Sequence, residues 1–235
     1  AGVFSIVLSD IVGDPLDMIA SGPAYPDAST AEQALAIVKK YALHLSDEAL
    51  SCLEAPTPNH LSNVETHITG SVRALCAAAQ DAAQKLGFQC RMLTDCLDCE
   101  AREAGRFLAS IARSHQQTER PLAFFAGGET VVHLTGQGLG GRNQELALAA
   151  APGLRGTQNT AVCSFGSDGT DGPTDAAGGF VDQSSDAALR AAGLDVPQVL
   201  AENDAYHALQ KIGGLLMTGP TGTNVNDLAM VLIWR

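Results

Sequence analysis

The sequence predicts an α/β protein, a three-layer α/β/α arrangement around a mostly parallel or mixed sheet. Apolar runs of strand length alternate along the chain with alanine-rich segments of helical periodicity. The 24 glycines, set against seven phenylalanines, three tyrosines and one tryptophan, favour many tight turns between strands and helices over an aromatic-rich sandwich. At 235 residues and 46% hydrophobic content, the chain can also bury a sizeable core.

The N-terminal part begins with an uninterrupted apolar run at residues 3–8, Val-Phe-Ser-Ile-Val-Leu, which is typical of a fully buried parallel strand. A loop-rich stretch follows. The next predicted elements are helices over residues 30–41 and 46–53. A candidate linker then lies at Pro56, Pro58 and Asn59. We therefore expect a domain boundary near residue 58.

The rest of the chain alternates strand and helix patterns, which predicts βαβ winding. The predicted strands cover residues 64–69, 88–94, 122–126, 130–135, 160–165 and 228–234. The predicted helices cover residues 72–86, 100–114, 143–150, 187–192 and 205–212. Strands that are joined by helices in this way form a sheet whose two faces are both covered.

The charge of the chain excludes several classes of partner. Twenty-six acidic residues against 14 basic ones give a net charge of −12, and no basic face is present to neutralise phosphates. We therefore expect neither a nucleic-acid partner nor an anionic membrane surface. No run of about 18 apolar residues and no signal-peptide pattern occurs, so we expect no membrane span and a cytoplasmic location.

The six cysteines lie mostly within apolar helix or strand patterns, which favours reduced, buried thiols over a disulfide framework. Cys96 and Cys99 form a CxxC pair. A single such pair without a second Cys or His pair is a weak indication of redox or zinc chemistry, and an incidental pair at a turn is the favoured interpretation.

A glycine-rich loop at residues 127–141 is the strongest functional indication in the sequence. Glycines let a backbone approach a ligand closely and direct N–H groups toward it, and the helix that follows offers its positive end to an anion. Arg142 stands at the start of that helix and supplies a cation. The glycines concerned are Gly136, Gly138, Gly140 and Gly141. The pattern predicts an anion cradle.

A second loop, residues 166–178, is rich in aspartate and glycine. Asp168, Asp171 and Asp175 are suited to bind Mg²⁺ or a ligand hydroxyl, because hard cations prefer carboxylate oxygens. Asp-Gly pairs also make ordinary turns, and the spacing by itself favours that interpretation. Residues 9–23 and 218–227 form two further polar loops at the ends of predicted elements, where α/β proteins collect ligands.

Other catalytic classes are less well supported. Residues 136–141 satisfy G-x-G-x-x-G and raise a nicotinamide-dependent dehydrogenase as an alternative, but the helix that follows opens with polar residues instead of an apolar turn. No lysine follows a glycine anywhere, which excludes a Walker-type NTPase. No histidine lies in a glycine-rich loop, so serine hydrolysis is disfavoured.

Taken together, these loops resemble the glycerate 2-kinase family, whose C-terminal half is known as the MOFRL domain and some of whose members were named hydroxypyruvate reductases. The resemblance spans nearly the whole chain, and its motifs occur in family order. They are Ser9–Asp14 with Ile19–Pro23, Gly127–Thr130, Gly140–Leu148, Thr170–Gly178, Asn203-Asp204 and Thr218–Asn226.

This resemblance implies that the chain is the C-terminal portion of a longer enzyme. Residues 1–58 would be the end of a preceding Rossmann-like glycerate kinase domain, and residues 59–235 a MOFRL-type α/β domain. Members of the family also carry an upstream glycine-rich loop and a functional lysine, neither of which occurs in this sequence, so activity is expected to require that region. A homodimer is allowed for, and the sequence leaves the oligomeric state open.

The implied reaction is phosphorylation of D-glycerate at its 2-hydroxyl by ATP with Mg²⁺. Arg142 and Asp168 would be catalytic, Arg142 neutralising the transferred phosphoryl group or the substrate carboxylate. Asp168 and Asp171 would organise Mg²⁺. The other residues implied in binding substrate or nucleotide are Ser21, Gly22, Gly128, Glu129, Thr130, Gly140, Gly141, Asn143, Glu145, Asp171, Asn203, Thr221, Gly222, Thr223 and Asn224.

Two alternatives remain open from the sequence. One is an NAD(P)H-dependent hydroxypyruvate reductase, which the loose glycine fingerprint and the older family name favour. The other is a ligand-binding module that keeps the loops without turnover.

Overall fold

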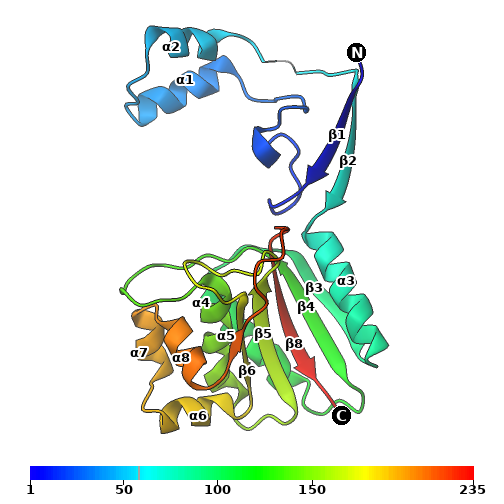
Figure 1. Cartoon of the computed structure of the whole chain (residues 1–235), viewed down its shortest axis with the longest axis vertical. Coiled ribbons are helices and arrows are strands. Elements are labelled where there is room, and N and C mark those ends of the chain that lie inside the picture. Colours follow the sequence, from blue (N-terminus) through cyan, green and yellow to red (C-terminus); the bar gives the residue numbers. More distant parts are fainter. Residues whose placement is uncertain (58) are drawn as a thin grey trace. The chain divides into compact units, whose positions relative to one another are not determined.

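The structure, a computed structural model, describes residues 1–57 and 59–235, so Pro58 of the predicted linker lies outside the described residues. The chain divides into two compact units (Figure 1). The smaller unit consists of residues 1–7 and 14–69, and the larger of residues 8–13 and 70–235. The boundary near residue 58 was predicted between two domains of the family, and it stays a prediction.

The smaller unit holds two helices, close to where the sequence predicts them. Thr30 caps the first through a capping box, because its hydroxyl accepts the N–H of Gln33 while the Gln33 side chain accepts the N–H of Thr30. Ser46 caps the second in the ordinary way. The elements are β1 (Val3–Leu8), a 3₁₀ turn (Ile19–Ser21), α1 (Ala31–Lys40), α2 (Asp47–Glu54) and β2 (Val64–Gly70).

Strand β1 corrects one expectation, since it is not buried. It pairs only with β2 in a two-stranded sheet, and its side chains remain accessible, with Phe4 62% and Ile6 66% exposed. An apolar run of this kind is buried only where a layer packs on each face of the sheet. The sequence pattern identified the strand correctly, and within the described part of this chain no layer covers its exposed side chains.

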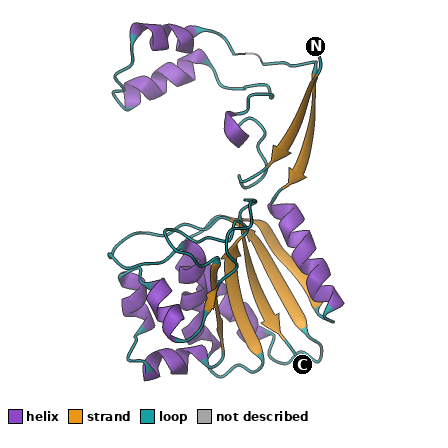
Figure 2. Cartoon of the chain, in the orientation of Figure 1, coloured by secondary structure: helices purple, strands orange, loops and turns teal. Residues whose placement is uncertain are grey.

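The larger unit contains a six-stranded sheet in the order β3-β4-β8-β5-β6-β7 (Figure 2). β3 runs parallel to β4, whereas β8 lies antiparallel between β4 and β5, and β6 and β7 continue antiparallel. The sheet is therefore mixed, as one of the two predicted forms. The strands are β3 (Gln89–Leu97), β4 (Leu122–Gly128), β5 (Thr160–Gly166), β6 (Gly178–Asp182), β7 (Leu215–Leu216) and β8 (Asp227–Ile233).

Helices cover both faces of this sheet, which confirms the three-layer prediction (Figure 1). Neighbouring residues of β4 mark the two faces: Phe124 packs in the cluster that includes Leu108 and Leu146, and Phe125 in the cluster that includes Val72. The helices are α3 (Val72–Lys85) on one face and α4 (Ala101–Ser114) and α5 (Arg142–Ala150) on the other, with α6 (Ser185–Ala191), α7 (Val196–Ala201) and α8 (Ala205–Lys211) beyond them.

The strand predicted at residues 130–135 does not form. Val131 makes only an isolated bridge to Glu100, and the N–H groups of Thr135 and Gly136 donate to a side chain instead of to a neighbouring strand. In contrast, β6 escapes prediction because it opens with two glycines, which disfavour strands. A Cβ on Gly178 would lie 2.0 Å from the Ser164 carbonyl oxygen, so the close approach of β5 requires glycine there.

The cysteines are all free, as expected, but only some are buried. Burial raises the pKa of the Cys163 thiol to about 12 and that of Cys76 to about 11, Asp95 adding to the latter, so neither forms a thiolate easily. Cys52, Cys96 and Cys99 are exposed, contrary to the expectation of mostly buried thiols. No helix in the described part of the chain combines the length and the apolar character of a membrane span.

Candidate active site

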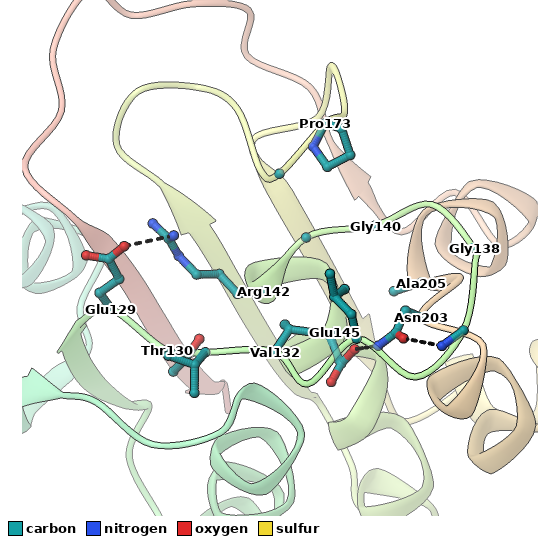
Figure 3. Close-up of a pocket in the computed structure, with 15 residues that line it drawn as sticks. Glu129, Thr130, Val132, Gly138, Gly140, Arg142, Glu145, Pro173, Asn203 and Ala205 are labelled. Atoms are coloured by element: carbon teal, nitrogen blue, oxygen red, sulfur yellow. Dashed lines mark hydrogen bonds and ion pairs between the residues drawn. The ribbon is translucent and has the colours of Figure 1, made fainter. Parts of the chain in front are cut away.

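A pocket of about 580 Å³ lies in the larger unit, between the loop that follows β4 and the start of α5 (Figure 3). Asn203 and Ala205, at the start of α8, and the turn at Gly172-Pro173 form the rest of its wall. The predicted site residues among its lining are Glu129, Thr130, Gly140, Gly141, Arg142, Glu145 and Asn203. The structure therefore brings together residues that are up to 74 positions apart in the sequence, from Glu129 to Asn203.

Part of the glycine loop donates its N–H groups within the chain, so those groups do not contribute to the predicted anion cradle. The N–H of Gly138 donates to the Glu202 carbonyl (2.8 Å), that of Leu139 to Asp204 Oδ1 (2.9 Å) and that of Gly136 to Asn203 Oδ1 (2.9 Å). These donors hold the loop against the segment before α8 and are not free for a ligand. The glycines have a packing role, because a Cβ on Gly138 would lie 2.6 Å from the Glu202 oxygen.

Asn203 connects this loop to helix α5. Its Oδ1 accepts the N–H groups of Thr135 (2.7 Å) and Gly136, and its Nδ2 donates to Glu145 Oε2 (3.2 Å). Glu145 in turn accepts from Arg102 Nε at 3.1 Å. Burial raises the pKa of Glu145, and the bonds from Asn203 and Arg102 oppose that rise. The pocket wall thus contains a buried carboxylate held between two donors.

Arg142, the first residue of α5, is already paired with two carboxylates. Its Nε donates to Asp227 Oδ2 (2.5 Å), its NH2 group donates to Asp227 Oδ1 (3.1 Å), and its NH1 group lies 2.9 Å from Glu129 Oε1. Burial alone would lower the pKa of Arg142, but the bonds and charges of Asp227 and Glu129 raise it above its usual value. The guanidinium is therefore fixed in orientation and always charged.

Asp227 is a site residue that the sequence analysis did not select. It begins β8 directly after the Thr218–Asn226 motif, and its side chain is only 9% exposed. The preceding Asn226 adds a second bond to the same network, since its Nδ2 donates to Glu129 Oε2 (3.2 Å) and to the Asp10 carbonyl (2.7 Å). The only sequence signal for this role was that two polar residues, Asn226 and Asp227, stand directly before a predicted strand. Their hydrogen-bond partners lie far away in the sequence.

Asp171 and Asn143 stabilise the N-terminus of α5. Asp171 Oδ1 accepts from the N–H (3.1 Å) and Nδ2 (3.2 Å) of Asn143, and Oδ2 accepts the N–H of Gln144 (2.8 Å). Ser164 donates its hydroxyl to Asn143 Oδ1. Burial raises the pKa of Asp171 to about 6, although these donors lower it and Asp227 adds to the rise. Both oxygens of Asp171 are thus committed to the helix.

Asp168 lies close to Asp227, with Gly166 between them. A Cβ on Gly166 would meet Asp168 Oδ1 at 3.1 Å and Asp227 Oδ1 at 3.4 Å. Asp168 Oδ1 also accepts the N–H of Thr170 at 2.9 Å. The carboxylate therefore stands beside the Arg142 pair, although it does not line the pocket.

The loop at residues 221–224 contacts Asp168 through its backbone. The N–H of Thr221 donates to the Asp168 carbonyl (3.0 Å), and the Thr221 hydroxyl donates to the Ser167 carbonyl (2.6 Å). Asn224 Oδ1 accepts the N–H of Asn226 (3.2 Å), which links the loop to the Arg142 network. Gly222 has a φ of +79°, so the turn needs glycine there. These predicted residues, with Thr223, lie outside the lining of the pocket.

The remaining predicted residues have local roles in the structure. Gly128 ends β4 at a φ of +150°, where a side chain would collide with Leu97. Thr130 is buried at the lining of the pocket, and its hydroxyl has no hydrogen-bond partner among the described residues. Ser21 and Gly22 lie in the smaller unit, in a turn where both have positive φ.

Comparisons with known proteins show which family this chain resembles. Residues 122–227 match the MOFRL family and residues 1–54 match a domain of unknown function (DUF4147). D-glycerate 2-kinase of Thermotoga maritima is 54% identical over 99% of this chain, which covers 57% of that protein. The crystal structure of glycerate kinase from the same organism has a TM-score of 0.93, again with 99% of this chain and 57% of that one covered.

The chain thus spans a little over half the length of the Thermotoga maritima relative. A glycerate kinase of Macaca fascicularis is 33% identical over 99% of this chain, and the match covers 72% of that protein. Both levels of identity accompany nearly complete coverage of this sequence, which confirms the resemblance carried by the loop motifs. The chain belongs to the glycerate kinase family.

Proposed function

We propose that this chain forms part of a glycerate 2-kinase, which transfers the γ-phosphoryl group of ATP to the 2-hydroxyl of D-glycerate and releases ADP and 2-phosphoglycerate. The observation that supports this most is the fixed guanidinium of Arg142 at a large pocket. The names of the Thermotoga maritima and Macaca fascicularis relatives supply the substrate.

Phosphoryl transfer requires positioning and charge neutralisation more than covalent chemistry from the protein. Arg142 supplies such a positioned charge, because two hydrogen bonds to Asp227 fix the orientation of its guanidinium. Glu129 occupies one guanidinium N–H group from the more exposed side, its side chain being 42% exposed. An incoming phosphate or carboxylate would exchange with Glu129 there and form a charge-assisted pair with Arg142.

Mg²⁺ would neutralise phosphate charge when it is bound with the nucleotide. The described residues contain no group of three or more His, Cys, Asp or Glu side chains arranged to hold a metal ion by themselves. Mg²⁺ in kinases needs only one or two carboxylates in addition to phosphate oxygens, so a single aspartate fits this requirement. We assign that role to Asp168, because both oxygens of Asp171 already accept N–H groups of α5.

The test is formation of ADP and 2-phosphoglycerate from D-glycerate and Mg-ATP. It is best run on this chain alone and on this chain joined to the part of the Thermotoga maritima relative that the match leaves uncovered, because the chain covers only 57% of that protein. Product from the joined protein alone would support the requirement for an upstream region. Absence of product from both, with NADH oxidation in the presence of hydroxypyruvate, would favour the reductase.

The reductase has no specific structural observation in its favour. A dinucleotide fingerprint needs free N–H groups in a tight turn from strand to helix. Here β4 ends at Gly128 and α5 begins only at Arg142, so the turn is not tight. Several N–H groups of the intervening glycine loop also donate to residues 202–204. A cytoplasmic location and a homodimer stay predictions from the sequence.

A further inference from the structure

We propose that the pocket beside Arg142 binds the nucleoside part of the nucleotide, with the base against its apolar wall and the ribose hydroxyls facing the Glu145 carboxylate. This inference rests on the proposed kinase function and adds to it a direction for the bound nucleotide. The phosphates would extend toward Arg142, and the nucleoside would occupy the space between the glycine loop and residues 203–205.

The size of the pocket is the first argument. At about 580 Å³ it falls within the range of roughly 300–1,000 Å³ that is typical of sites for ligands of nucleoside size and larger. D-glycerate has a three-carbon skeleton and would fill only a small part of that space. The pocket therefore fits the larger of the two substrates.

The apolar wall is the second argument. Val131, Val132, Leu134, Pro173 and Ala205 all line the pocket. Leu134 is 83% exposed, although the loop beside it is held by Asn203 through Thr135 and Gly136. An exposed apolar side chain next to a fixed backbone gains contact when a flat apolar group enters the pocket.

The polar groups of the wall are the third argument. The loop N–H groups at residues 135, 136, 138 and 139 already donate within the chain, so this part of the wall has few donors for phosphate. Its side chains instead offer an acceptor, the carboxylate of Glu145, whereas Glu129 lies at the Arg142 end of the pocket. Carboxylates repel a triphosphate but accept hydrogen bonds from ribose hydroxyls and from a base amino group.

The position of the cation is the fourth argument. Arg142 is the basic residue among the described residues that line the pocket, and it lies near Glu129, away from Gly138 and Ala205 (Figure 3). A ligand that fits both ends of the pocket has negative charge at the Arg142 end and a flat apolar group at the other end. A nucleoside triphosphate has that form.

Binding of adenosine to this chain, measured by calorimetry, tests the proposal without requiring turnover. The residues that line the pocket all belong to the larger compact unit of this chain. We expect adenosine to bind, to compete with ATP, and to bind about tenfold more weakly after Leu134→Ser, since that change removes apolar contact area. Leu86→Ser is the matched control, because Leu86 is also highly exposed (77%) but lies at the end of α3 outside the pocket.

The outcomes separate this proposal from the proposed function. If ATP or inorganic tripolyphosphate binds and adenosine does not, the pocket recognises phosphate, and the proposal is wrong even if the enzyme is a kinase. If D-glycerate displaces adenosine or Leu134→Ser changes only glycerate binding, the pocket is the acceptor site and the proposal is again wrong. If adenosine binds, if Leu134→Ser weakens that binding, and if the protein never forms 2-phosphoglycerate, the pocket binds a nucleoside but the kinase assignment is wrong.

Discussion

Arg142 donates to both carboxylate oxygens of Asp227, at 2.5 and 3.1 Å, and this pair joins the first residue of α5 to the first residue of β8. Two planar groups in a bidentate arrangement fix each other's orientation as well as their charge. Asp227 therefore determines where the guanidinium points, and Glu129 pairs with the NH1 group on the more exposed side.

Replacing Arg142 with alanine is expected to lower kcat/KM for phosphoryl transfer about a thousandfold, by analogy with arginines that neutralise a transferred phosphoryl group. The measurement is steady-state kinetics with D-glycerate and Mg-ATP in the form of the enzyme that carries activity. A loss of less than about tenfold would remove Arg142 from the reaction.

Asp227→Asn tests the positioning role separately from the charge of Arg142. The amide keeps one acceptor and places an NH₂ group against the guanidinium donors, so the fork must rotate. We expect kcat to fall about a hundredfold with a smaller change in the KM of either substrate. Asp186→Asn is the matched control, because Asp186 is also buried and paired with two arginines, Arg155 and Arg190, but lies away from the pocket.

Glu129→Gln is expected to tighten anion binding. The Glu129 carboxylate competes with an incoming anion for the NH1 group of Arg142 at 2.9 Å, and the neutral amide competes less. Inorganic phosphate should bind the variant about threefold to tenfold more tightly, with a weaker dependence on salt. Weaker binding by the variant would mean that Glu129 contacts the ligand or its metal directly, which titration with and without Mg²⁺ can distinguish.

The sequence predicted the layers of the larger unit well because its cores follow simple periodicities. Phe124 and Phe125 alternate between the two faces of β4, and α4 carries small and apolar residues on one side. Arg142 was also identifiable, since it stands at a helix start after glycines. Its partner Asp227 was not, because β8 is inserted between β4 and β5 and this order leaves no local pattern.

The failed strand at residues 130–135 has a similar cause. Its β-branched Thr130, Val131 and Val132 favour a strand, but the N–H of Thr135 finds its partner 68 positions away, in Asn203. Local propensity is a weak constraint when a distant side chain offers a better hydrogen bond. The loop before α5 also packs closely against residues 202–204, which gives Gly136 and Gly138 a packing role that the sequence pattern does not predict.

Gly138→Ala distinguishes these two roles. If the glycine served only a ligand, the unliganded protein would tolerate alanine, but a Cβ would lie 2.5 Å from Asp204 Cβ and 2.6 Å from the Glu202 oxygen. We expect the variant to unfold more easily by about 1–3 kcal/mol in chemical denaturation without ligand. Gly2→Ala is the control, since nothing lies within 4 Å of a Cβ there, and equal stability of the two variants would restore the ligand-binding interpretation.

Asp171 makes stability depend on pH in an unusual direction for a carboxylate. Its pKa rises from 3.8 when unfolded to about 6 when folded, because burial outweighs the N–H donors of α5. The folded state therefore binds its proton more tightly than the unfolded state, and the stability gained from protonation is present below pH 3.8 and lost as pH rises through about 6. The two pKa values correspond to a loss on the order of 3 kcal/mol.

The measurement is the free energy of unfolding of the protein and of Asp171→Asn between pH 4 and pH 8. Other carboxylates change stability in both proteins alike, so the difference between them isolates Asp171. The protein should lose stability relative to the variant as pH rises from about 4 to about 6, and the difference should be constant above pH 7. A difference that moves the opposite way would mean that the three N–H donors from Asn143 and Gln144 outweigh burial and hold Asp171 ionised.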